Sequence, residues 1–163
     1  MKRICFAAFL LFLVHASMSQ VTYYKGEWRV PDKTDLFTCI CKIDIQKGAA
    51  VEAEFIWIFK AIDSTNEEMM KMYEGKQGKK GIEFTKGTYN PATGDIYLEA
   101  TQLRDPDVIL GMAKYFLKLS ANKKTVYGTT KNIVGDEPGV FYAVRMKSSG
   151  SKEFEMLKKS VKE

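Results

Sequence analysis

Apolar and polar residues alternate with a period of two along most of the chain between residues 20 and 150. Successive side chains of a β-strand point to opposite faces, so this period predicts strands that each bury one face. Turn-forming residues such as "NPATGD" separate the alternating stretches. The predicted strands are 22–30, 36–45, 51–62, 81–89, 95–103, 108–120, 125–132 and 140–146.

One of these stretches, 108–120, is also long enough for a helix. Its second half, "KYFLKLS", alternates, and we therefore interpret the whole stretch as a strand. Eight strands joined mostly by short turns are typical of an antiparallel up-and-down β-barrel, whose closure leaves no exposed sheet edge. We predict an all-β fold, with this eight-stranded barrel as a domain over residues 20–150. A barrel of this size has room for side chains or for one small ligand.

A short helical insertion is predicted between two of the strands, at about residues 64–74. Ser64 or Thr65 can cap a helix there, and two glutamates follow in its first turn. The segment then runs into a loop rich in glycine and lysine that extends to residue 80. Long loops of this kind often carry function.

The C-terminal segment, 151–163, is predicted to form a short helix or a tail. Phe154, Leu157 and Val161 fall on one face at helical spacing. Ile56 and Ile58 interrupt the polar face of strand 51–62, so something is expected to cover them. Either the helix docks there, or the segment remains a frayed, lysine-rich tail.

Residues 1–19 have the pattern of a secretory signal peptide. Lys2 and Arg3 precede the apolar run "ICFAAFLLFLV", and small residues follow it. This run is shorter than the roughly 20 apolar residues of a membrane anchor. We therefore expect a secreted, extracellular protein with no stable membrane insertion.

The expected mature chain lacks the residues for several common kinds of catalysis. Its one histidine, His15, lies in the signal segment, so histidine-based triads and zinc sites are excluded. Carboxylates are plentiful, but no spacing singles out a pair for glycoside hydrolysis. Asp105 and Asp107 are too few for calcium, which takes about six or more oxygen ligands, and they suit a turn better. We expect no enzyme, no metal site and no cofactor.

Charge gives a weak indication of partners. The formal net charge of +5 falls to +3 once Lys2 and Arg3 are removed. Basic and acidic residues are interspersed, without the arginine-rich stripe of a nucleic-acid-binding protein, so no nucleic-acid partner is expected. Attraction to acidic glycans or matrix stays open.

Cys39 and Cys41 lie two residues apart in the strand "LFTCICKIDI" and point to the same face. Their Cα atoms are expected about 6.5 to 7 Å apart, at the strained limit for a disulfide. Three interpretations stay open: two small buried side chains, a strained local bridge, or a bridge to another chain. A metal site is not expected, because no third soft ligand is nearby.

Gly26 and Trp28 form a Gly-x-Trp step in the first strand, and Arg145 lies in the last strand, "VFYAVRM". In these features the sequence resembles the calycin superfamily of lipocalins, fatty-acid-binding proteins and avidins. The resemblance implies that Trp28 closes one barrel end, that Arg145 packs over its ring, and that Gly26 lets the backbone bend around it. The lipocalin Thr-Asp-Tyr motif and avidin's set of tryptophans are absent, so it implies an architecture without a particular ligand.

Two groups of side chains are candidates to line a cavity: the inward faces of strands 36–45 and 51–62, and tyrosines of the later strands, which supply hydroxyls. They are Phe37, Cys39, Cys41, Phe55, Trp57, Phe59, Tyr97, Tyr115 and Tyr127. They predict a barrel that binds a small apolar or amphipathic molecule without covalent chemistry. The alternative is an interaction or matrix protein with a filled barrel, acting through its basic surface loops.

Overall fold

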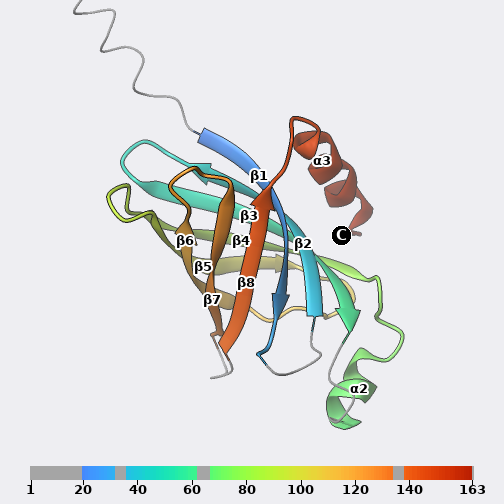
Figure 1. Cartoon of the computed structure of the whole chain (residues 1–163). Coiled ribbons are helices and arrows are strands. Elements are labelled where there is room, and N and C mark those ends of the chain that lie inside the picture. The colour runs from blue at the N-terminus through green and yellow to red at the C-terminus, as the bar shows by residue number, and fades with distance from the viewer. Residues whose placement is uncertain (1–19, 32–35, 62–66, 134–137, 163) are drawn as a thin grey trace, which may run out of the picture.

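Eight strands close into an antiparallel barrel in which neighbours in sequence pair and the last strand returns to the first (Figure 1). The computed structural model describes residues 20–31, 36–61, 67–133 and 138–162. The strands are β1 (Gln20–Arg29), β2 (Leu36–Ile45), β3 (Ala50–Ala61), β4 (Lys80–Tyr89), β5 (Asp95–Arg104), β6 (Ala113–Leu119), β7 (Thr125–Asn132) and β8 (Pro138–Arg145). The predicted fold class, an up-and-down barrel, is confirmed.

The strand predicted at 108–120 begins later than expected. β6 starts at Ala113, and residues 105–112 form a loop. Val108 has a φ of 51°, a left-handed conformation that is rare for a β-branched residue and incompatible with a strand. Asp105 holds this loop, since its Oδ2 accepts a hydrogen bond from the Leu110 backbone N–H at 2.6 Å. The alternating "KYFLKLS" therefore marks the strand, and the apolar residues before it belong to the loop.

β1 and β8 close the barrel along a seam where their backbones approach closely. Gly26 lies opposite Ala143, and a Cβ at residue 26 would lie 2.2 Å from the backbone oxygen of Tyr142. A side chain at this position would collide with the backbone of β8, so glycine is required. The glycine of the Gly-x-Trp step thus permits strand pairing, whereas the resemblance implied that it bends the chain around the indole.

The expected packing of Arg145 over Trp28 is wrong. In the β1–β8 register Trp28 lies opposite Phe141, whereas Arg145 lies opposite Tyr24, four positions away along β1. At about 3.3 Å per residue, this separates the two sites by about 13 Å. Arg145 is exposed, and the β8 residue against the indole is Gly139, where a Cβ would lie 1.9 Å from Trp28 Nε1.

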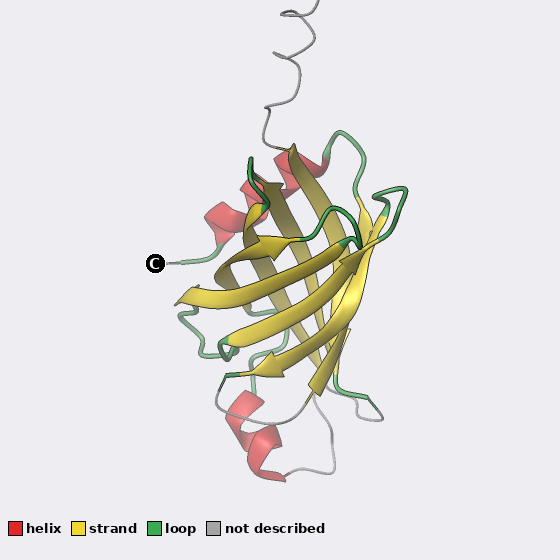
Figure 2. Cartoon of the chain, turned by 90° about the vertical axis from the view of Figure 1, so that its left-hand side faces the viewer, coloured by secondary structure: helices red, strands yellow, loops and turns green. Residues whose placement is uncertain are grey.

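The C-terminal helix α3 (Gly150–Ser160) docks on the outer surface of the barrel (Figure 2). It contributes to a second apolar cluster outside the barrel interior. The buried members of that cluster are Ile40, Ile56, Ile82, Phe154 and Val161. The Tyr23 ring also contacts Phe154, with centroids 5.5 Å apart. The predicted docking of the helix is confirmed. It covers Ile56, whereas the half-buried Ile58 lies outside this cluster.

The predicted helical insertion is also present, as α2 (Glu67–Tyr73), and it lies at one end of the barrel (Figure 1). The expected capping residues Ser64 and Thr65 lie outside the described residues. Tyr73, the last residue of α2, stacks on Phe59 of β3 with ring centroids 4.9 Å apart. This contact attaches α2 to the barrel end where β3 finishes.

Candidate functional site

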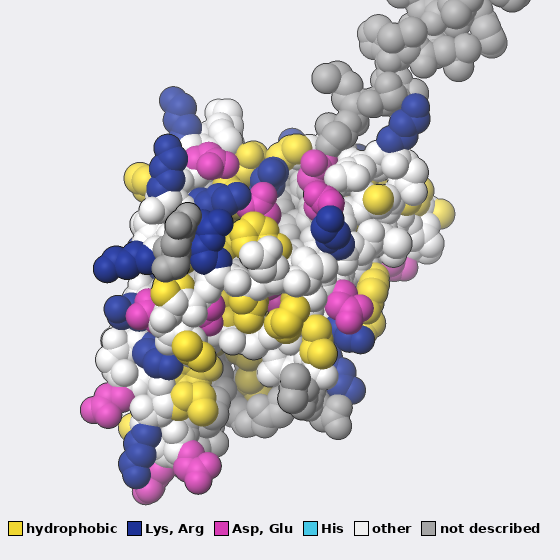
Figure 3. All heavy atoms as spheres, turned by 180° about the vertical axis from the view of Figure 1, so that it is seen from behind, with side chains coloured by type: hydrophobic (Ala, Val, Ile, Leu, Met, Phe, Trp, Pro, Cys, Tyr) yellow, Lys and Arg dark blue, Asp and Glu magenta, His cyan; other side chains and the backbone are white. Residues whose placement is uncertain are grey.

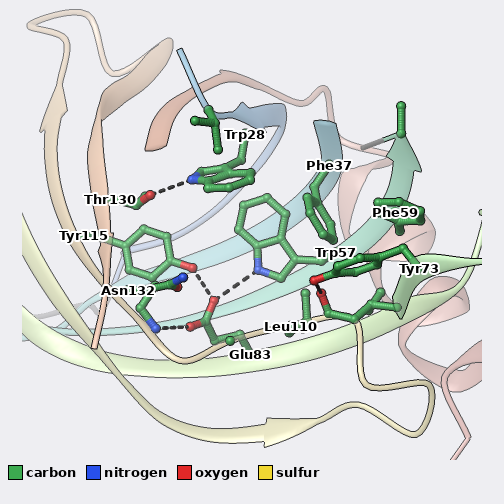
Figure 4. Close-up of a pocket in the computed structure, with 15 residues that line it drawn as sticks. Trp28, Phe37, Trp57, Phe59, Tyr73, Glu83, Leu110, Tyr115, Thr130 and Asn132 are labelled. Atoms are coloured by element: carbon green, nitrogen blue, oxygen red, sulfur yellow. Dashed lines mark hydrogen bonds between the residues drawn. The ribbon is translucent and has the colours of Figure 1, made fainter. Parts of the chain in front are cut away.

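A cavity of about 140 Å³ lies inside the barrel, at the end where β1 and β3 finish and where β4 and β6 begin (Figure 4). Its walls come from several strands, from α2 and from the 105–112 loop. Aromatic side chains form much of the wall: Trp28, Phe37, Trp57, Phe59, Tyr73 and Tyr115. The described lining includes no lysine, arginine or histidine, and Glu83 is its one carboxylic acid.

Several aromatic rings meet edge to face around the cavity, whereas Phe59 and Tyr73 are stacked. Phe37 lies at the centre of the group, with its centroid 5.7 Å from Trp28 and 6.4 Å from Trp57. The interplanar angles of these two pairs are 69° and 85°. Edge-to-face pairs are favourable through their quadrupoles, and they present both ring faces and ring edges to a bound molecule.

Trp28 is fixed in place on both its polar and its apolar side. Its Nε1–H donates a hydrogen bond to Thr130 Oγ1 at 2.5 Å. Gly139 of β8 lies directly against the ring, leaving no room for a Cβ. The indole is therefore a preformed part of the cavity wall, and the role that the resemblance gave to Arg145 falls to Thr130 and Gly139.

Glu83 of β4 lies between the rings of Tyr115 and Trp57 (Figure 4). Its Oε2 accepts hydrogen bonds from Trp57 Nε1–H, at 3.2 Å, and from the Tyr115 hydroxyl. Its Oε1 accepts one from the Ala113 backbone N–H at 3.1 Å. Glu83 is only 2% exposed, so this carboxyl is a buried polar group within an aromatic site.

Burial changes the acidity of this site. Desolvation raises the pKa of Glu83 to about 7, against the lowering effect of the hydrogen bonds that it accepts. Burial, followed by the neighbouring carboxylate, raises the pKa of Tyr115 well above its usual range. Near neutral pH the Glu83 carboxyl therefore exchanges between its neutral and charged forms, while Tyr115 remains a hydrogen-bond donor.

Below this cavity the barrel interior is packed. Phe55 lies nearly parallel to Tyr115, at 7° and 4.8 Å between centroids, and nearly parallel to Trp57, at 6° and 5.6 Å. Cys39 and Cys41 are buried beside it. These side chains end the cavity on its inner side, so a bound molecule is confined to one half of the barrel.

Four of the side chains predicted for the cavity do line it: Phe37, Trp57, Phe59 and Tyr115. Phe55, Cys39 and Cys41 also face the interior, but they belong to the packed half. Both cysteines are free and buried, which supports the interpretation as small interior side chains over either disulfide. Burial and a hydrogen bond with Cys41 raise the pKa of the Cys39 thiol well above its usual range.

Tyr97 and Tyr127 were expected inside the barrel, and this is wrong. Ile96 and Leu98 occupy the inner face of β5, so Tyr97 between them points outward and donates a hydrogen bond to Glu99 at 2.9 Å. Tyr127 is 44% exposed, on the opposite face of β7 from the buried Val126. Neither hydroxyl is available to a molecule in the cavity.

The sequence prediction missed several residues of the cavity wall, among them Thr130, Asn132 and, most importantly, Glu83. Strand 81–89 contains Ile82 and Phe84, which suggest that the even-numbered positions face the core. Instead, both side chains pack in the outer cluster beneath α3, so the odd-numbered Glu83 points inward. The amphipathic C-terminal helix was a signal that could have indicated this, because a strand that a helix covers can be apolar on its outer face.

The aspartates at 105 and 107 serve the loop, as the turn interpretation expected. Asp105 accepts the Leu110 N–H, and Asp107 forms an ion pair with Lys79 at 3.2 Å. Within the part of the chain that the structure describes, no three histidine, cysteine, aspartate or glutamate side chains gather to hold a metal ion.

Basic and acidic side chains are interspersed on the face seen in Figure 3. In the lysine-rich loop after α2, Lys79 is paired with Asp107, and Lys76 donates to the Val108 carbonyl oxygen at 3.0 Å. At least these two lysines therefore connect the loop after α2 to the 105–112 loop.

Comparison with protein-family models, with curated proteins and with solved structures finds no match for this chain. Neither α2 nor α3, nor any other described helical segment, has the length and apolar character needed to cross a membrane.

Proposed function

We propose that the barrel binds one small apolar or amphipathic molecule, non-covalently, in the cavity at its α2 end. The observation that carries this proposal is an aromatic cavity with one buried carboxyl in its wall. Pockets for small molecules are typically apolar, with a few placed polar groups that orient the ligand.

The size of the cavity limits the ligand. An apolar cavity of about 150 Å³ in another protein accepts benzene, so about 140 Å³ suits a molecule of roughly one ring. A long acyl chain would have to displace Phe55 and Tyr115, which are packed in parallel below. The proposed ligand is therefore much smaller than a fatty acid.

The described lining offers no serine, cysteine or histidine side chain as a nucleophile. We therefore propose binding rather than covalent catalysis. The closed up-and-down barrel supports a place in the calycin superfamily as part of this proposal. The expected signal peptide at 1–19 supports binding outside the cell.

The chain contains a direct reporter of binding, because both of its tryptophans, Trp28 and Trp57, line the cavity. Titration with benzyl alcohol, toluene or phenol should change the intrinsic fluorescence in a saturable way. Ala113 also lines the cavity, and the substitution Ala113→Leu should abolish the change by filling the space.

Ala50→Leu provides the matched control, since Ala50 is exposed at the start of β3, at the far end of the barrel. It should bind as the wild type does. Absence of a saturable signal with every one of these probes, or equal binding by Ala113→Leu, would contradict the proposal.

A further inference from the structure

We infer that the ligand is a small amine, whose ammonium group pairs with Glu83 while its apolar part lies among the aromatic rings. This inference rests on the proposed binding function and narrows its ligand class. It is carried by three observations: the remaining acceptor capacity of Glu83, the absence of a cation in the described lining, and the identity of the surrounding rings.

Glu83 retains room for one more donor. An ionised carboxylate offers about four lone-pair sites, two on each oxygen. Trp57 and Tyr115 use those of Oε2, whereas Oε1 accepts one hydrogen bond from the described residues, that of the Ala113 N–H. A ligand N–H can therefore bond Oε1 without displacing a protein group. A ligand carboxylate or carbonyl has nothing to accept there while Glu83 is ionised.

No described side chain of the cavity wall neutralises this carboxylate. The titratable groups that face it are Tyr115 from β6 and, more remotely, Cys39 from β2, while Tyr73 of α2 lines the same cavity. All of these are neutral or anionic, never cationic. A buried charge is stabilised by an opposite charge with good hydrogen bonds. The ligand is the partner that can supply that charge.

The surrounding rings favour a cation as well. Trp57 and Tyr115 flank Glu83 and donate to it, and Trp28 stands across the cavity (Figure 4). Ammonium groups are attracted to the faces of aromatic rings, most strongly to tryptophan. The same walls accept the apolar part of an amine, so one site serves both halves of such a ligand.

The pairing makes binding depend on pH in a defined direction. Alkylammonium groups stay protonated below about pH 9, whereas Glu83 loses its charge as the pH falls through about 7. An amine should therefore bind more tightly at pH 8 than at pH 5.5. A neutral molecule of the same shape should show no such gain.

The experiment compares benzylamine with benzyl alcohol. The two molecules share the benzyl group, and benzylamine has an amino group where benzyl alcohol has a hydroxyl. Intrinsic fluorescence and calorimetric titrations at pH 8 should give benzylamine an advantage of about tenfold or more, since it adds a charged hydrogen bond. The advantage should shrink at pH 5.5. It should also disappear in Glu83→Gln, while Glu99→Gln, on the outer face of β5, should keep it.

The outcomes separate the two proposals. Equal binding of both probes at pH 8, or a preference for benzylamine that does not change with pH, overturns the amine assignment and leaves cavity binding intact. Binding of neither probe overturns both. The pH profile of the wild-type protein decides the assignment even where Glu83→Gln does not fold.

Discussion

The two halves of the barrel interior are built from the same alternating strands, yet one is filled and the other holds a cavity. In the filled half, the ring of Phe55 lies within 7° of parallel to both Tyr115 and Trp57. In the half with the cavity, Phe37 meets Trp28 and Trp57 at 69° and 85°. Both halves contain steep and stacked ring pairs, since Phe141 meets Phe55 at 83° in the filled half and Phe59 stacks on Tyr73 beside the cavity. The clearer difference is chemical, because the buried Glu83 carboxyl lies in the cavity wall, whereas Phe55 is packed among apolar side chains.

The largest test of this contrast is to remove one ring from each half. Phe55→Ala should lower the free energy of unfolding by about 3–5 kcal/mol, because it opens a void in a packed core. Phe37→Ala should lower it by less, about 1–2 kcal/mol, because Phe37 is only half-buried beside an existing cavity. Urea denaturation followed by circular dichroism measures both changes. Equal losses would show that the halves are packed alike.

Glu83 should make stability depend on pH in the half with the cavity. Its pKa of about 7 in the folded chain exceeds the value of about 4.3 expected in the unfolded chain. Between these values the folded state binds more protons, so stability should fall as the pH rises from about 4.5 to about 7, by up to about 3 kcal/mol.

The difference between wild type and Glu83→Gln isolates this contribution. Burial raises the pKa of Glu54, but its ion pairs with Lys158 and Lys42 outweigh this effect and lower the pKa overall. Glu54 therefore has the opposite effect on the pH dependence of stability, and it is present in both proteins. Denaturation midpoints should be measured for both proteins from pH 4.5 to pH 8. As the pH rises, the midpoint of the wild type should fall relative to that of Glu83→Gln, because Glu83 is the group in which they differ. Parallel profiles for the two proteins would contradict the assigned pKa.

Adding volume should distinguish the halves more finely. Ala143→Leu, at a fully buried position, should lower the free energy of unfolding by about 1–3 kcal/mol through overpacking. Ala113→Leu has the cavity to fill and should cost less than about 1 kcal/mol. Thermal denaturation of the two variants side by side checks this. A larger loss of stability in Ala113→Leu than in Ala143→Leu would contradict the position of the cavity.

A change outside both halves sets the baseline. Lys25 on β1 pairs with Glu153 on α3 at 3.0 Å, with the lysine side chain exposed and the glutamate side chain partly exposed. Lys25→Ala should lower the free energy of unfolding by about 0.5 kcal/mol or less, and by still less in high salt. A loss as large as that of Phe55→Ala would show that α3, rather than the interior, dominates stability.

The strands could be predicted because alternation is a local property. Spacing alone predicts which residues of a strand share a face, as it does for Trp57 and Phe59 of β3 and for Phe37 of β2. The choice of which face is inward is less local, since it depends on what covers the outside. Ile82 packs beneath α3 on the outer face of the barrel. Because this contact joins segments far apart in the sequence, the local pattern could not show that Glu83 points inward.

The errors at Tyr97, Tyr127 and Arg145 have two causes. The inward positions of β5 and β7 are taken by residues such as Ile96 and Val126, and the neighbours of these residues must point outward. The alternation around Tyr97 and Tyr127 is therefore a sequence signal for their outward orientation. The offset between Trp28 and Arg145, by contrast, depends on the register between the first and last strands, which no local pattern specifies.

The seam at Gly26 also bears on how the protein is made. It joins the first strand of the barrel, β1, to the last, β8, so the barrel cannot close until all eight strands have been synthesised. Ordering such distant segments is entropically costly and slows folding. Until β8 emerges from the ribosome, β1 and β7 present unpaired edges on which other chains can add strands. The yield of folded protein should therefore depend on how briefly the growing polypeptide remains in that incomplete form.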